Sequence, residues 1–282
     1  MSKKKYISIV IVLIIIGYII LSAIPNIFIQ KIKELEKIKT MQIIAHRGGA
    51  GIGIENTLLC INKGIALGAN MIEIDVHLSK DGHLIVCHDQ TVDRTTNGKG
   101  KIRELTLQEI RKLKIVDYNG NITDENLPLL YEVIELVNGR VPLLVEIKQP
   151  RKIYKGIEQK LLEEIEKYNA TSWIIVQSFN DSVLENIHKI NPEIRLEKLL
   201  FCKFFGLPLI FDGTISKFNF KKYTHVSSFN ISFRAAAPHL IKKIHQQGKE
   251  VKIWTLSEPE KLPNVTIEGV ITDRPDLWTK LK

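Results

Sequence analysis

The chain has 282 residues, of which 44% are hydrophobic and 25% are charged, and its formal net charge at pH 7 is +9. This composition excludes a disordered chain and allows one large α/β domain or two small ones. The three cysteines, Cys60, Cys87 and Cys202, are too few and too scattered for a disulfide framework or a zinc site built on cysteine.

The positive charge is concentrated near the N-terminus. Residues 1–39 contain seven lysines and two glutamates, so this segment has a net charge of +5 and the rest of the chain has +4. The rest of the chain has no stripe of lysine and arginine interleaved with aromatic residues, the pattern that is typical of nucleic-acid binding. We therefore expect no nucleic-acid partner.

A long apolar run lies between two groups of lysines. No residue between Lys5 and Lys31 is charged, and Ile7–Ile24 is almost wholly apolar. At 1.5 Å per residue, this run would reach about 27 Å as a helix, which is roughly the thickness of a hydrocarbon core. We therefore predict a single transmembrane anchor within residues 1–30, followed by a charged linker helix over residues 31–40.

Two alternatives to the anchor are a cleaved signal peptide and a soluble apolar helix. A signal peptide usually has an apolar region of only about 7–15 residues before a small-residue cleavage site, and Ser22–Pro25 is a poor site of that kind. A buried helix would not need lysines on both sides. Because lysines flank both ends of the run, the positive-inside rule nearly balances. The orientation stays open, and a body outside the cytoplasm is our working expectation.

Strand and helix patterns alternate from Met41 onward. Strands are predicted over Gln42–Ala45, Met71–Val76, Leu84–Cys87, Leu143–Ile147, Trp173–Gln177, Ile194–Leu199, His225–Ser228, Val251–Thr255 and Gly269–Thr272. Helices are predicted over Thr57–Leu67, Leu107–Leu113, Leu130–Leu136, Ile157–Tyr168, Ser182–Lys189 and Ala236–Gln247. Repeated strand–helix units indicate a parallel sheet with helices outside it.

One predicted strand does not fit a parallel crossover. Only a few residues separate Met71–Val76 from Leu84–Cys87, and Asp81-Gly82 between them is a hairpin signal. We therefore predict that Leu84–Cys87 pairs antiparallel with the strand before it. Eight strands remain, which is the number that closes a (β/α)8 TIM barrel over residues 41–282, with Asp89–Arg140 as an insertion after the second barrel strand.

Charged residues interrupt two of the apolar strands. Glu73 and Asp75 are two residues apart, as are Glu146 and Lys148, so each pair faces one side of its strand. Neighbouring carboxylates repel each other unless a cation lies between them, and Ca²⁺ and Mg²⁺ prefer oxygen ligands. Inside a barrel, these residues indicate a cation site, with Glu146 as a candidate third ligand and Lys148 as a candidate phosphate contact. The alternatives are solvated acids on an exposed strand and a simple ion pair between Glu146 and Lys148.

Other candidate site residues also lie close to strand ends. His46 and His88 each follow a predicted strand, where a histidine could exchange protons with a substrate, and Arg47 could hold a phosphate through two hydrogen bonds. Glu55 near the first helix and Trp254 near a strand end are further candidates for substrate contacts. The alternative for each is a structural role, such as a packed histidine, a helix start or a core tryptophan.

In this order and spacing, the motifs resemble the glycerophosphodiester phosphodiesterase family. The resemblance extends from about Ile43 to Trp278 and therefore covers nearly the whole body. The matching segments are His46-Arg47-Gly48, Glu55-Asn56-Thr57, Glu73-x-Asp75, His88-Asp89, Arg94–Gly100, Glu146-x-Lys148, Gln177-Ser178-Phe179, Trp254-Thr255 and Ile271-Thr272-Asp273-x-Pro275.

The resemblance implies an enzyme that hydrolyses glycerophosphodiesters to glycerol 3-phosphate and an alcohol. It implies one divalent cation, Ca²⁺ or Mg²⁺, at positions that match Glu73, Asp75 and Glu146. The phosphate-contacting positions match Arg47 and Lys148.

The resemblance also assigns the acid–base pair. The base matches His46 and the acid matches His88, although the sequence by itself leaves the order of these two roles open. All the matched site positions hold the residue that the family pattern requires, which indicates an active enzyme.

Three other functions compete with this one. A membrane anchor makes a lysophospholipid substrate plausible, and the enzyme would then be a lysophospholipase D. A membrane-tethered protein could instead bind phosphorylated ligands without turnover, but it would not need two histidines. A glycosidase could use Glu73 and Glu146 if their carboxyl groups were about 5–5.5 Å apart, but His46, His88 and Arg47 make it a poorer explanation.

Overall fold

The computed structural model describes residues 32, 35–149, 153–203, 210–211 and 219–282. The predicted transmembrane anchor, Ile7–Ile24, lies outside these residues. Within the described ranges, no helix is both long enough and apolar enough to span a bilayer. Residues 35–40 of the predicted linker are helical.

Residues Met41–Lys280 form one compact unit built around a closed sheet. Among the described residues, eight strands pair in parallel in the order β1-β10-β9-β8-β6-β5-β4-β2, and β1 also pairs with β2. This closure confirms the predicted TIM barrel. The strands are β1 (Gln42–Ala45), β2 (Met71–Leu78), β4 (Leu143–Ile147), β5 (Ile174–Ser178), β6 (Arg195–Lys203), β8 (Ser228–Ser232), β9 (Glu250–Trp254) and β10 (Gly269–Thr272).

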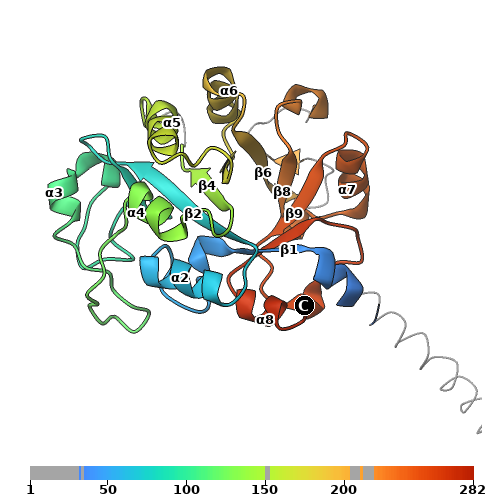
Figure 1. Ribbon diagram of the computed structural model, residues 1–282, viewed down its shortest axis with the longest axis horizontal. Helices are drawn as coiled ribbons and strands as arrows, with labels where there is room; N and C mark the ends of the chain where they lie inside the picture. Colours follow the sequence, from blue (N-terminus) through green and yellow to red (C-terminus); the bar gives the residue numbers. More distant parts are fainter. Residues whose placement is uncertain (1–31, 33–34, 150–152, 204–209, 212–218) are drawn as a thin grey trace, which may run out of the picture. The chain divides into compact units, whose positions relative to one another are not determined.

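Helices surround the strands, as Figure 1 shows. They bury apolar stripes against the outside of the sheet and leave charged residues exposed, as in α5, where Leu161 and Ile165 are buried. Inside the barrel, apolar side chains from different strands form a separate cluster of Ile44, Met71, Leu144, Ile175 and Ile271. The helices are α2 (Leu58–Ala66), α4 (Leu130–Val137), α5 (Ile157–Lys167), α6 (Asp181–Ile190), α7 (Pro238–His245) and α8 (Pro275–Thr279).

The predicted hairpin and insertion are both present. Strand β3 (Leu84–Val86) pairs antiparallel with β2, and Gly82 in the connecting turn has a φ of 84°, which favours glycine. The insertion contains the 3₁₀ turn η2 (Ile102–Glu104) and the short helix α3 (Leu107–Ile110). Its own core contains Ile85, Cys87, Val92, Ile102, Ile110, Ile115, Leu127 and Leu129. The insertion therefore folds around β3 as a small lobe of the barrel.

The structure differs from the prediction at three elements. The strand predicted at His225–Ser228 is wrong in position, because β8 begins only at Ser228. Its residues Ser228 and Asn230 are polar and buried, which hides the strand from a hydrophobic pattern. Strand β7 (Ile210–Phe211), which pairs antiparallel with β6, was not predicted. Helix α8, which begins at Pro275, was also not predicted.

Candidate active site

The carboxyl ends of the barrel strands bring most of the predicted site residues together. A cavity of about 130 Å³ is lined by seven of the nine predicted residues, and Asp75 and Glu55 contact this group without lining the cavity. The seven are His46, Arg47, Glu73, His88, Glu146, Lys148 and Trp254. This is the end of a TIM barrel at which active sites are built.

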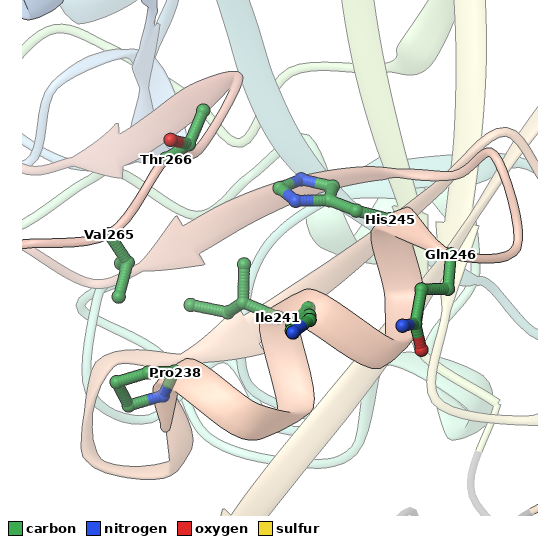
Figure 2. A pocket seen from close by; sticks show the side chains of 7 residues that line it. Pro238, Ile241, His245, Gln246, Val265 and Thr266 are labelled. Carbon is green, nitrogen blue, oxygen red and sulfur yellow. The ribbon is translucent and has the colours of Figure 1, made fainter.

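A second, larger pocket lies elsewhere, between helix α7 and the segment before β10 (Figure 2). It has a volume of about 440 Å³, and its side chains include those of Ile241, His245 and Val265. No carboxylate lines this pocket among the described residues, and none of the predicted site residues does. The cavity at the strand ends is therefore the candidate active site.

Three carboxylates form the centre of the site. Asp75 and Glu146 are direct neighbours in the register of β2 and β4, and Glu73 lies one inward-facing position before Asp75. Oxygen atoms of Glu73, Asp75 and Glu146 lie within 4.8 Å of one another, and the three residues are only 1%, 0% and 6% exposed. This arrangement concentrates negative charge in a place that water scarcely reaches.

The pKa values of these carboxyl groups reflect that crowding. Burial, followed by the charge of Asp75, raises the pKa of Glu73 to about 7. Burial also raises the pKa of Glu146 above its usual range. Burial acts on Asp75 in the same direction, but the positive charges of Lys148 and Arg47 outweigh it and lower the pKa of Asp75.

The acidic cluster fits a divalent cation. Among the described residues, no group donates a hydrogen bond to the buried Asp75 Oδ1, although Lys148 Nζ lies 3.0 Å from it. Three buried carboxylates offer the hard oxygen ligands that Ca²⁺ and Mg²⁺ prefer. Burial and the charge of Asp75 raise the pKa values of Glu73 and Glu146, and a cation here would offset the repulsion among the three carboxylates.

Arg47 is fixed beside the carboxylates by a turn that follows β1. It lies in η1 (His46–Gly48) with a left-handed φ of 53°, and its backbone N–H donates to Glu73 Oε2 at 3.0 Å. Its guanidinium donates to Glu55 Oε1 at 3.0 Å, and Nε lies 3.5 Å from Asp75 Oδ2. Glu55 also accepts two hydrogen bonds from Arg94. Glu55, which does not line the cavity itself, therefore holds both arginines in place.

Each predicted histidine has a carboxylate partner. His46 Nδ1 lies 2.6 Å from Asp273 Oδ1, and His88 Nδ1 lies 2.7 Å from Asp89 Oδ1. A carboxylate at Nδ1 orients the ring and leaves Nε2 to exchange a proton with another group. The site therefore contains two histidine–aspartate pairs.

The two histidines differ in their electrostatic surroundings. Burial acts to lower the pKa of His46, but the hydrogen bond with Asp273 and the charge of Glu73 outweigh it, so the pKa is raised. Burial lowers the pKa of His88, and the nearby Asp75 and Asp89 offset this only in part.

Sequence reasoning missed several residues that support the site. Asn56 Nδ2 donates to Asp75 Oδ2 at 2.9 Å, and Arg94 links Glu55 to Asp89. His77 is buried in β2, with Nε2 3.0 Å from the carbonyl oxygen of His88 and Nδ1 2.7 Å from Tyr154 Oη. The one sequence signal for these supporting residues was membership of the motifs that match the family, to which four residues belong: Asn56, Asp89, Arg94 and Asp273.

Aromatic rings form one wall of the cavity. Trp254 lies 5.7 Å from both Phe179 and Phe201, measured between ring centroids, and its Nε1 donates to the carbonyl oxygen of Asn230. Phe201 is 52% exposed, so this wall continues to the protein surface. The cavity therefore combines a charged floor with an apolar side.

Together, the fold and the site define a TIM-barrel protein with a buried carboxylate triad that could hold a cation, and with two histidines, each paired with an aspartate, that line the same cavity. Residues 46–277 match the glycerophosphoryl diester phosphodiesterase family. A glycerophosphodiester phosphodiesterase of Caldanaerobacter subterraneus subsp. tengcongensis is 34% identical over 244 residues, which cover 85% of this chain and 96% of the relative. The chain belongs to the glycerophosphoryl diester phosphodiesterase family.

Two further relatives are described by a product or an activity. A solved structure of an Oleispira antarctica phosphodiesterase in complex with the product sn-glycerol-3-phosphate has a TM-score of 0.71 and 25% identity, and covers 85% of this chain and 96% of its own. A lysophospholipase D of Rattus norvegicus is 26% identical over 271 residues, which cover 85% of this chain and 84% of the relative.

The crowded carboxylates predict that a cation stabilises the fold. Adding Ca²⁺ or Mg²⁺ to chelator-treated protein should raise the melting temperature, because a bound cation offsets their mutual repulsion. At about 100 times the Kd, the gain is about 2.7 kcal/mol, or roughly 5–10 °C for a domain of this size. Thermal melts should show this shift in the wild type and in the exposed control Glu166→Gln, but not in Asp75→Asn. An equal shift in Asp75→Asn would contradict the assignment.

Proposed function

We propose that this protein is a metal-dependent glycerophosphodiester phosphodiesterase that releases glycerol 3-phosphate and an alcohol. The observation that carries the proposal is one cavity lined by Glu73 and Glu146 of the carboxylate triad, by two cationic side chains and by two histidines, each of which is paired with an aspartate. A relative with the same activity in its name and a solved relative that holds sn-glycerol-3-phosphate support it.

The cationic groups of the site suit a phosphodiester. A divalent cation, Ca²⁺ or Mg²⁺, held by Glu73, Asp75 and Glu146 would draw negative charge from the phosphoryl oxygens. Lys148 Nζ lies 2.8 Å from Glu146 Oε1, and although burial acts to lower its pKa, Asp75 and Glu146 raise it, so the ammonium stays charged. Arg47 and Lys148 therefore bind the phosphate and stabilise the charge that builds up in the transition state.

The two histidines serve as base and acid. In our proposal, His46 deprotonates the nucleophile, either water or a substrate hydroxyl, and His88 protonates the leaving alcohol. The charge of Glu73 is one cause of the raised pKa of His46, so neutralising that charge favours the neutral ring that a base needs. Asp89 at 2.7 Å stabilises the imidazolium that His88 needs as an acid.

A lysophospholipid is the second candidate substrate. The observation that favours it is the aromatic wall of Phe179, Phe201 and Trp254, which extends from the cavity to an exposed ring. Such a surface suits an acyl chain better than a small polar alcohol. The rat lysophospholipase D relative supports this alternative.

The substrate assay is the first test of the proposed function. The purified full chain in mild detergent should release glycerol 3-phosphate from glycerophosphocholine when Ca²⁺ or Mg²⁺ is present, and not with chelator. Glu73→Ala should abolish the release, since it removes a cation ligand, and Glu166→Gln should not change it. If the enzyme does not hydrolyse glycerophosphocholine but releases lysophosphatidic acid from lysophosphatidylcholine, the second candidate substrate is the better assignment. If folded protein hydrolyses neither substrate, the proposal that it is an enzyme is refuted.

A leaving-group comparison tests the roles of the histidines. His46→Ala and His88→Ala should each lower kcat on glycerophosphocholine by about 10²–10⁴. With the 4-nitrophenyl ester of glycerol phosphate, His88→Ala should regain most of its rate, because nitrophenolate leaves without a proton, whereas His46→Ala should stay slow. The exposed His239→Ala serves as the control. Rescue of His46→Ala instead would reverse the two roles, and normal rates in both would remove them from the mechanism.

We also propose that Ile7–Ile24 anchors the protein in a membrane, with the barrel outside the cytoplasm. The length and apolarity of the run support the anchor, and the orientation is our working expectation. The full chain should sediment with membranes after an alkaline wash, and external protease should cleave the barrel in spheroplasts. Replacing Ile15 and Ile16 together by arginine should release the chain, because each arginine costs about 2.5–3.5 kcal/mol at the helix centre. Release of the wild type by the wash would refute the anchor, and protection from protease would place the barrel inside.

A further inference from the structure

A row of buried polar side chains leads from the carboxylate cluster into the depth of the barrel. Gln177 Nε2 donates to Glu73 Oε1 at 3.1 Å, and Asn230 Nδ2 donates to Gln177 Oε1 at 2.8 Å. Asn230 Nδ2 also donates to Glu197 Oε2 at 2.8 Å, and Glu197 forms an ion pair with Lys252. Gln177, Asn230, Glu197 and Lys252 are all 0–1% exposed. Four strands, β5, β8, β6 and β9, thus contribute to one hydrogen-bonded chain.

The ion pair at the far end sets the direction of this chain. Glu197 is paired with Lys252 and its carboxylate can only accept hydrogen bonds, so Asn230 must turn its amino group toward it. Ser228 Oγ donates to Asn230 Oδ1 at 3.1 Å, which is consistent with that orientation. The second amino hydrogen of Asn230 then goes to Gln177 Oε1. Gln177 therefore has its own amino group left for Glu73.

This direction matters at the cation site. Gln177 and the backbone N–H of Arg47 donate to the two different oxygens of Glu73, which restrains rotation of the carboxylate. If the amide of Gln177 were reversed, it would place an acceptor against the acceptor oxygen of Glu73, and the side chain would have to turn away. Partners behind a metal ligand commonly influence metal affinity in this way.

We propose that Gln177, Asn230 and Glu197 are positioning residues that orient Glu73 for the cation. The inference rests on the proposed cation site and adds that its affinity is set partly by residues other than its carboxylate ligands. Gln177 lines the cavity, whereas Asn230 and Glu197 do not. Packing alone would not require this arrangement, since apolar side chains of similar size can replace buried ionic groups without loss of stability.

Glu197→Gln is the decisive variant. A glutamine at position 197 that keeps its carbonyl oxygen toward Lys252 turns its amino group toward Asn230. The side-chain amide of Asn230 must then turn its oxygen toward this group, and the amide of Gln177 must turn over in response. The Kd for Ca²⁺, measured by isothermal titration calorimetry on the chelator-treated full chain and repeated with Mg²⁺, should rise about tenfold or more. Gln177→Met, which removes the donor to Glu73, should have a similar effect and serves if Glu197→Gln does not fold.

The double variant Glu197→Gln with Asn230→Asp separates positioning from stability. It keeps the net charge and lets the introduced glutamine amide donate to the introduced carboxylate, so its melting temperature should stay near that of the wild type. The carboxylate introduced at position 230 can only accept a hydrogen bond from the Gln177 amino group. The carbonyl oxygen of Gln177 therefore still faces Glu73, and the cation affinity should stay low. Ser178→Ala is the matched control. Ser178 is on the same strand as Gln177, and the substitution removes its buried hydrogen bond to the carbonyl oxygen of Ile147.

The outcomes are distinct. A weak-binding double variant of normal stability supports the positioning role. The positioning role would be overturned if folded variants bound the cation as tightly as the wild type. It would also be overturned if cation affinity fell only in proportion to the melting temperature. If the wild type itself binds neither Ca²⁺ nor Mg²⁺, the proposed cation site fails first, and the positioning role fails with it.

Discussion

Negative charge buried in the mouth of the barrel is the constraint on which the rest of the site depends. The parallel register of β2 and β4 places Asp75 beside Glu146, and the period of two along β2 brings Glu73 to the same face. Three buried carboxylates this close cannot all remain charged without compensation. The surrounding groups supply it: the Arg47 backbone and guanidinium, the Lys148 ammonium and the Asn56 amide all face this cluster.

The need for polar partners around the buried carboxylates also explains why the interior of the barrel has an apolar part and a polar part. One part is apolar, with Ile44, Met71 and Leu144 in contact, while another is a hydrogen-bonded row that ends at Glu197 and Lys252. The polar row also explains an error of the sequence analysis. Strand β8 was displaced in the prediction because Ser228 and Asn230 point into the barrel, where apolar residues were expected. The residues that hid the strand are those that connect to the site.

Sequence reasoning could locate the strand-end residues but not their partners. Alternation along a single strand predicts that Glu73 and Asp75 share a face, and the structure confirms it. Partnerships such as His46 with Asp273, 227 residues apart, depend on closure of the barrel and leave no trace in local spacing. Glu55, a predicted substrate contact, accepts hydrogen bonds from Arg47 and Arg94 and does not line the cavity. Its residue type and position could not predict these two partners.

The insertion explains how a second histidine reaches the cavity. Every other charged group that lines the cavity is on or just after a barrel strand, but His88 follows β3, the antiparallel excursion from β2. Two contacts tie it down: Cys87 N donates to the Asp75 carbonyl oxygen, and His77 Nε2 holds the His88 carbonyl oxygen. The lobe core around Ile85 and Cys87 packs behind these contacts. The position of His88 thus depends on the folding of the insertion, and the lobe helps to build the candidate site.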